Sequence, residues 1–178
     1  MKKKTIYSII FYSIFWLFIL YIRTDNFRDF AYNKGEFNDI IIENYNKEAA
    51  EEGFQQVSIV KYSGDDRMKK TSRSQIYIEE MLALFDDLHL VEDSERWNLE
   101  DTKYRISFDN INTPESVDII LFDESHLSVW ITLVDKKIDE KNKIIHYDQD
   151  FIDYGYSIQD DSINLKKLEE VFNSIKNQ

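Results

Sequence analysis

Residues 104–134 read YRISFDNINTPESVDIILFDESHLSVWITLV, and this stretch holds three apolar runs separated by polar connections. The runs cover residues 104–108, 116–122 and 127–134. Alternation of apolar and polar side chains, clearest in the first run, is typical of strands that bury one face. The connections contain Asp, Asn, Glu and Ser, which favour turns. The stretch therefore predicts three strands in an antiparallel meander.

Two further runs extend this sheet. Residues 55–62 alternate Val57 and Ile59 with Ser58, and a Ser-Gly-Asp-Asp turn follows. Residues 143–148 (KIIHYD) have the composition of a strand, which residues 151–158 can continue. The sequence thus predicts an antiparallel sheet of about five strands.

Two stretches show the helical period instead. Apolar residues recur every three or four positions over residues 78–88 and again over residues 165–175. The first follows a SRSQ segment with capping-box spacing, and Asn164 or its neighbours Asp161 and Ser162 can cap the second. The predicted fold class is α+β, with the sheet covered by two amphipathic helices.

The N-terminus suggests a membrane anchor. Residues 5–22 (TIYSIIFYSIFWLFILYI) contain no charge, proline or glycine, and a helix of this length spans about 27 Å. Lysines at positions 2–4 precede it, which places the N-terminus in the cytoplasm by the positive-inside rule. A cleaved signal peptide is the alternative, but no Ala or Gly occurs before Ala31 to form a cleavage site. We expect a single-pass protein of the cell membrane with an extracytoplasmic domain.

This interpretation divides the chain into three parts: a Lys-rich start and transmembrane anchor at residues 1–23, a juxtamembrane segment at 24–53, and the α+β domain at 54–178. The middle segment is rich in aromatic residues, so we expect it to pack against the domain rather than form a free stalk. Its NYNKEAAEEG stretch predicts a short helix that ends at Gly53.

The charge composition narrows the function. The chain has 34 acidic and 22 basic residues, a net charge of −12, which repels nucleic-acid phosphates. It has no cysteine, so disulfide scaffolds and Cys-ligated zinc sites are excluded. All acidic residues follow residue 24, and the expected domain is therefore more acidic than the whole chain.

No sequence motif points to catalysis. The three histidines, His89, His126 and His146, lie near no G-x-S-x-G elbow, and the four glycines form no phosphate loop. His146 and Asp148 lie on one face of a predicted strand and could hold a metal, although a solvated polar face is the simpler reading. The aspartates that follow lack the Gly and Glu positions of a calcium loop. We expect no enzyme activity, catalytic residue, metal or cofactor.

Aromatic residues gather in and before the late strands, and such residues form either the core or interface anchors. They are Trp97, Trp130, Tyr147, Tyr154 and Tyr156. Together with the strand alternation and the acidic balance, they lead us to predict partner contacts at Trp130, His146, Asp148 and Asp150.

The Lys-rich start, the aromatic apolar segment, the acidic remainder and the late run LSVWITLVDKKIDEKNKIIHYDQDF resemble the TipC family of immunity proteins. Members of this family are anchored outward in low-GC Gram-positive bacteria and neutralise toxins that type VII secretion delivers. The likeness covers the layout of the chain and mainly residues 127–153. It implies a non-enzymatic inhibitor whose sheet binds a secreted toxin.

Two alternatives remain open from the sequence. An envelope sensor or assembly factor would bind a resident membrane partner. An enzyme would lose its activity when His146 or Asp148 is changed.

Overall fold

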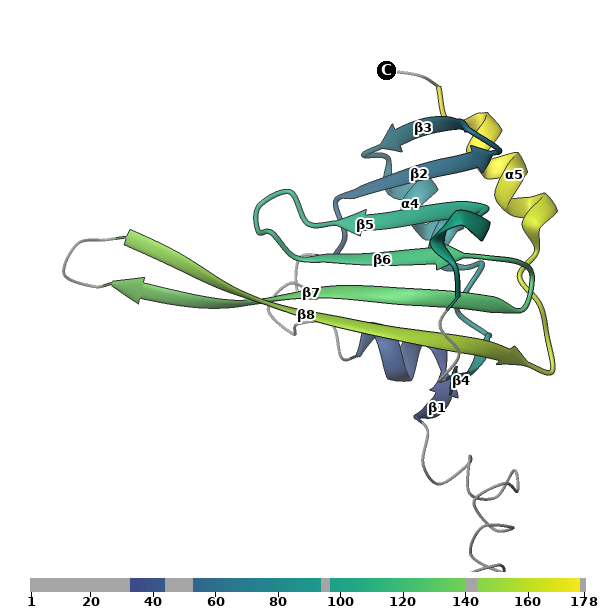
Figure 1. Ribbon diagram of the computed structural model, residues 1–178. Coiled ribbons are helices and arrows are strands. Elements are labelled where there is room, and N and C mark those ends of the chain that lie inside the picture. Colours follow the sequence, from purple (N-terminus) through teal and green to yellow (C-terminus); the bar gives the residue numbers. More distant parts are fainter. Residues whose placement is uncertain (1–32, 44–52, 94–96, 140–143, 177–178) are drawn as a thin grey trace, which may run out of the picture. The chain divides into compact units, whose positions relative to one another are not determined.

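Eight strands join edge to edge in the order β1-β4-β8-β7-β6-β5-β2-β3 (Figure 1). This computed structural model describes residues 33–43, 53–93, 97–139 and 144–176, without the side chains of residues 133–150. The chain divides into two compact units, residues 1–34 and 35–178, and the second is described here.

The strands are β1 (Lys34–Glu36), β2 (Gln56–Ser63), β3 (Asp66–Ser72), β4 (His89–Asp93), β5 (Tyr104–Asp109), β6 (Ser116–Leu121), β7 (His126–Asp139) and β8 (Ile144–Gln159). The helical elements are the π-helix η1 (Asn38–Ile42), α4 (Gln75–Leu82), the 3-10 helix η2 (Leu99–Asp101) and α5 (Leu165–Ser174). Strands β5 to β8 pair antiparallel in chain order, as the meander predicts.

The prediction of about five strands with two amphipathic helices is wrong. Strands β1, β3 and β4 were not predicted, and β7 runs to Asp139, beyond its predicted end at residue 134. Strand β3 (DRMKKTS) lies at the sheet edge with most of its side chains exposed, so it shows no apolar alternation. Charged residues on an edge strand are a common protection against unwanted pairing.

The helical stripe predicted over residues 78–88 also ends early. Helix α4 stops at Leu82, and the turns that follow still bury Phe85 and Leu88 in the core. Residues 89–93 then form β4, which pairs with the end of β8 from His89↔Gln159 to Asp93↔Gly155. The apolar residues over positions 78–88 are therefore buried as expected, but those after Leu82 are not part of the helix.

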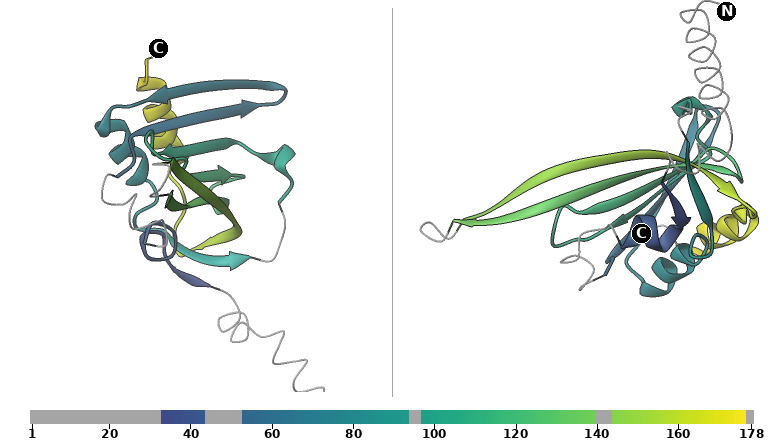
Figure 2. Two further views of the ribbon diagram at one scale, coloured as in Figure 1. Left: turned by 90° about the vertical axis from the view of Figure 1, so that its left-hand side faces the viewer. Right: turned by 90° about the horizontal axis from the view of Figure 1, so that it is seen from below.

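The core lies between one face of the sheet and the layer formed by α4, α5 and η1 (Figure 2). Strand β5 shows most clearly that alternate side chains point into this core, because Tyr104, Ile106 and Phe108 are buried and their neighbours are not. The core also contains Phe37 and Ile41 from the predicted juxtamembrane segment. The helix predicted in NYNKEAAEEG lies outside the described residues.

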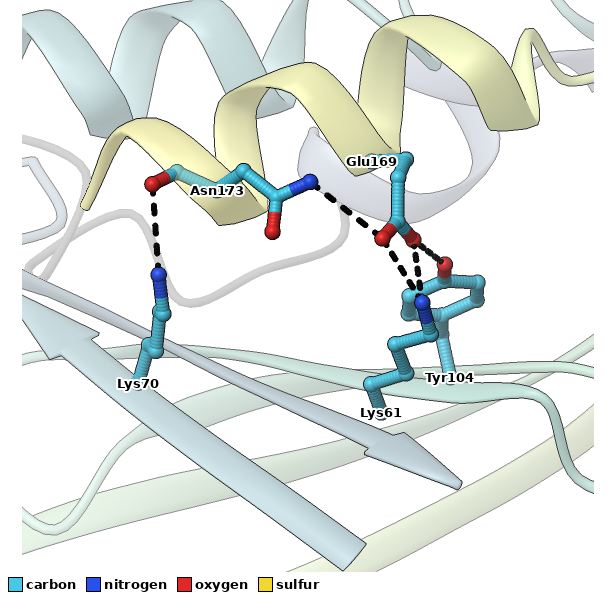
Figure 3. A network of polar contacts seen from close by, with 5 residues as sticks. All are labelled: Lys61, Lys70, Tyr104, Glu169 and Asn173. Atoms are coloured by element: carbon cyan, nitrogen blue, oxygen red, sulfur yellow. Dashed lines mark hydrogen bonds and ion pairs between the residues drawn. The ribbon is translucent and has the colours of Figure 1, made fainter. Parts of the chain in front are cut away.

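Helix α5 is held to the sheet by polar contacts around Glu169 (Figure 3). The Lys61 ammonium lies 2.7 Å and 2.8 Å from the two Glu169 carboxylate oxygens, and the Tyr104 hydroxyl donates to the same carboxylate. The Asn173 amide donates to it at 3.3 Å. Nearby, the Lys70 ammonium donates to the Ile175 carbonyl at 2.8 Å, so two lysines bind the same helix.

These contacts shift two pKa values in opposite directions. The hydrogen bond from Lys61, with that from Tyr104, holds the pKa of the Glu169 carboxyl below its usual range. Burial, with the nearby Glu169 carboxylate, raises the pKa of the Tyr104 phenol. Both groups therefore keep their ordinary neutral-pH forms, an ionised carboxylate and a protonated phenol.

The membrane prediction is not supported. In the part of the chain that the structure describes, no helix is long and apolar enough to cross a bilayer. The predicted anchor at residues 5–22 lies outside the described residues. We therefore do not retain the predicted single-pass topology, extracytoplasmic domain or cell-membrane location.

Candidate functional site

The sheet face opposite α4 and α5, here called the open face, is crossed by one connection of the chain (Figure 1). Strand β4 pairs with β8, whereas β5 lies between β6 and β2, and residues 97–103 lie over this face on the way to β5. We call residues 97–103 of this connection the strap. Its Trp97 ring lies 4.2 Å from the His126 ring and 5.9 Å from the Phe122 ring, measured between centroids.

A pocket of about 380 Å³ lies beside the strap. The apolar side chains that line it are those of Trp97, Leu99, Phe122 and Trp130, and the polar ones are those of Asp93, Ser128 and Asp153. Glu92 and Tyr154 border the pocket from strand positions whose side chains face the other side of the sheet. The pocket thus combines aromatic rings with carboxylates.

The register of β7 and β8 explains how this lining forms. Trp130 pairs with Asp153 and Ser128 pairs with Gly155, so these positions share the open face. Gly155 also pairs with Asp93 of β4 and contributes no side chain, which leaves a hollow between its two neighbours.

Two hydroxyl groups fix the pocket carboxylates. The Ser128 hydroxyl donates to Asp153 Oδ1 at 3.0 Å, and the Ser157 hydroxyl donates to Asp93 Oδ2 at 2.6 Å. Asp153 is exposed, while Ser128 is buried. The carboxylates of Asp93 and Asp153 are therefore oriented by hydroxyl groups of the sheet. That of Asp153 is also open to solvent.

Farther along the open face, Trp130 meets a second set of charges. The Arg105 guanidinium carbon lies 5.6 Å from the centre of the Trp130 ring, a distance at which cation–π attraction acts. Arg105 Nε also lies 3.1 Å from Asp118 Oδ1, and the Ser107 hydroxyl donates to the same oxygen. Trp130 is thus held between this ion pair and the pocket.

The turn between β6 and β7 carries a histidine–carboxylate pair. His126 Nδ1 lies 2.9 Å from both oxygens of Asp123. Burial raises the pKa of Asp123, but the Ser125 N–H and the His126 contact outweigh it and hold the pKa below its usual value. The pair orients the imidazole that faces Trp97, so we assign it a role in seating the strap.

Strands β7 and β8 continue beyond the rest of the sheet as a two-stranded arm, defined by residues 133–139 and 144–150 (Figures 1 and 2). The last pair that β7 forms with β6 is Thr132 with Ser116. Among the described residues, no other strand pairs with the arm. Both outer edges of the arm backbone are therefore without a strand neighbour in the described chain.

The four predicted contact residues do not form one cluster. Trp130 lies on the open face at the pocket, as its strand position suggests. His146, Asp148 and Asp150 lie in the arm, opposite positions 137, 135 and 133, and their side chains are outside the described set. Seven residues separate Trp130 from position 137, which is about 24 Å along an extended strand.

The residues that complete the pocket were not predicted as a site. The sequence marks Trp97 only as one of several aromatic residues, and Asp153 only as part of a segment that does not match a calcium loop. No local signal joins them to Asp93, because strand pairing alone brings residues 93 and 153–155 together. A buried Trp97 Nε1 without a hydrogen-bond partner in the described part of the chain adds to the polar character of this region.

Comparisons of this chain with protein-family models, with curated proteins and with solved structures found no match. The resemblance to the TipC family stays a prediction that rests on the sequence.

Proposed function

We propose that this protein is a non-enzymatic inhibitor that binds and neutralises a secreted antibacterial toxin through protein–protein contact. The observation that carries the proposal is the arm, which extends β7 and β8 by seven residue pairs past the last strand that supports them. An isolated two-stranded ribbon is marginally stable in water, so contact with a partner would stabilise it. The sequence resemblance through residues 127–153 covers this same hairpin.

The open face supports the proposal with a set of interface-type residues. Tryptophan and arginine are enriched among residues that dominate binding energy, and this face presents Trp130 and Arg105. The net charge of −12 favours a partner with a basic surface. A toxin whose active cleft is basic would be covered by such an acidic protein.

Capture and protection together test the proposal. The full chain, immobilised, is exposed to secreted and membrane fractions from its own strain and close relatives, and the retained protein is identified by mass spectrometry. We expect one secreted protein that stops bacterial growth when expressed alone. Adding the full chain should abolish that effect at a one-to-one ratio, because an inhibitor without turnover acts by stoichiometric binding.

Other outcomes would contradict it. A resident envelope protein as the retained partner would favour the sensor or assembly factor instead. Protection at amounts far below one equivalent would indicate turnover, and then H146A and D148N should be tested for loss of activity.

The predicted contacts at Asp148 and Asp150 have a separate test. Reversal of both charges, D148K with D150K, should lower the association rate with the captured toxin about tenfold at low salt, because these charges steer encounter. The matched control is D65K with D66K, an equal change of charge at the β2–β3 turn in another part of the sheet. Equal association rates in both double variants would remove Asp148 and Asp150 from the interface. Stopped-flow or biosensor kinetics measure the effect.

A further inference from the structure

The pocket beside the strap joins two features that each attract positive charge: aromatic rings and fixed carboxylates. We infer that it receives a basic side chain, arginine or lysine, which the protein partner presents. This inference rests on the proposed function and specifies the chemistry of the partner at one point.

The aromatic part of the argument concerns two rings. Trp97 and Trp130 line the pocket, and tryptophan is the side chain that attracts cations most strongly through its ring face. The protein already uses this interaction at the same ring, because Arg105 lies over Trp130. A second cation on the pocket side would repeat the contact with Trp130 and add Trp97.

The carboxylate part concerns Asp153 and Asp93. Each accepts a hydrogen bond from a serine hydroxyl of the open face, so each is oriented before a ligand arrives. A guanidinium group prefers such fixed carboxylates because its planar N–H donors form two parallel hydrogen bonds. Orientation in advance also reduces the entropy lost on binding.

The pocket is accessible and large enough for a side chain. Leu99 at its rim is 57% exposed, so the pocket opens to solvent on this side. A volume of about 380 Å³ lies in the range of binding pockets, roughly 300 to 1,000 Å³. The acidic charge of the chain adds a long-range attraction for the same ligand.

The test uses the full chain and a small probe. N-acetyl-arginine amide is titrated while NMR follows the three tryptophan indole N–H signals, assigned from single Trp→Phe variants. Its neutral isostere, N-acetyl-citrulline amide, is the control ligand. We expect the Trp97 and Trp130 signals to shift with a dissociation constant in the millimolar range, while the Trp16 signal stays fixed. The citrulline probe should bind at least about tenfold more weakly.

One pocket variant and two controls sharpen the test. D153N removes a charge without changing shape and should weaken arginine binding about threefold to tenfold. D65N removes a charge away from the pocket, and Y154L removes a ring from the opposite face of the sheet, so both should leave arginine binding unchanged. Equal responses to the arginine and citrulline probes, or equal affinity in D153N and D65N, would overturn the inference.

The result can be separated from the proposed function. If the captured toxin binds D153N as tightly as the original chain, the pocket is not the contact and the inhibitor proposal still stands. If the arginine probe binds as expected but no secreted toxin is retained, the pocket chemistry stands and the inhibitor proposal fails.

Discussion

At the scale of single residues, the carboxylate of Glu169 makes contacts that no pattern in the sequence predicts. It is bound by Lys61, which is 108 positions away, and by Tyr104, which is 65 positions away. The helical period of residues 165–175 predicts that α5 packs on the sheet, and Asn164 caps it by accepting the Lys167 N–H at 2.9 Å. Periodicity cannot predict which of 34 acidic residues meets a lysine on the far strand.

The shifted pKa of Glu169 makes a prediction about stability and pH. Because the folded-state pKa lies below the ordinary value of about 4.3, the ion pair stabilises the protein above that value and loses this effect as pH falls through the folded-state pKa. At pH 7 we expect E169Q to lower the free energy of unfolding by about 1 kcal/mol, a low value because the pair is partly exposed. The gap between the two proteins should close in acid.

Urea unfolding of both proteins from pH 7 to pH 3 measures that gap. Comparison of the two cancels the acid effects that the other carboxylates share. The control is E170Q, which changes an exposed neighbour on the same helix and should cost little at any pH. A gap that stays constant down to pH 3 would show that the charge of Glu169 does not contribute.

At the scale of elements, the sequence predicted the strands whose two faces differ and missed the others. Strands β2, β5 and β6 have one buried face and lie within two residues of their predicted bounds. Strand β4 is only five residues long and follows the helical stripe directly, so no separate period reveals it. The distal half of β7 (LVDKKID) is strand because β8 pairs with it along its whole length, which is a property of the pair.

The arm allows a prediction at this scale. Replacing residues 136–147 with an Asn-Gly turn should leave the sheet intact, since every pair that β7 forms with β6 lies at or before Thr132. The midpoint of urea unfolding should change little, and affinity for the captured toxin should fall at least about a hundredfold if the arm carries main contacts. Unfolding curves and isothermal titration calorimetry measure the two effects. A shortened protein that folds and still binds with full affinity would place the interface elsewhere on the sheet.

At the scale of the whole molecule, the sequence predicted one residue of the candidate site and not its setting. Trp130 follows from strand alternation and its aromatic character. The pocket beside it is built from β4, the strap, the β6–β7 turn, β7 and β8, five parts that only the strand order brings together. The crossing of the strap over the open face depends on β4 pairing with β8, and that strand was not predicted.

The charge of the whole chain leads to a prediction about kinetics. A net charge of −12 should draw a basic partner from beyond contact distance, and salt screens such attraction. The screening length falls from about 30 Å at about 0.01 M salt to about 3 Å at about 1 M. Over that range the association rate constant with the captured toxin should fall at least about tenfold. The dissociation rate constant should change much less, because close contacts at the arm and pocket determine it.

Biosensor kinetics at a series of salt concentrations give both constants. The D148K with D150K variant should show a shallower dependence of association on salt than the D65K with D66K control of equal net charge, because the predicted contact charges contribute most to steering if they face the partner. An association rate constant that does not change with salt would mean that the acidic surface faces away from the partner. The aromatic side chains of the open face would then have to supply recognition alone.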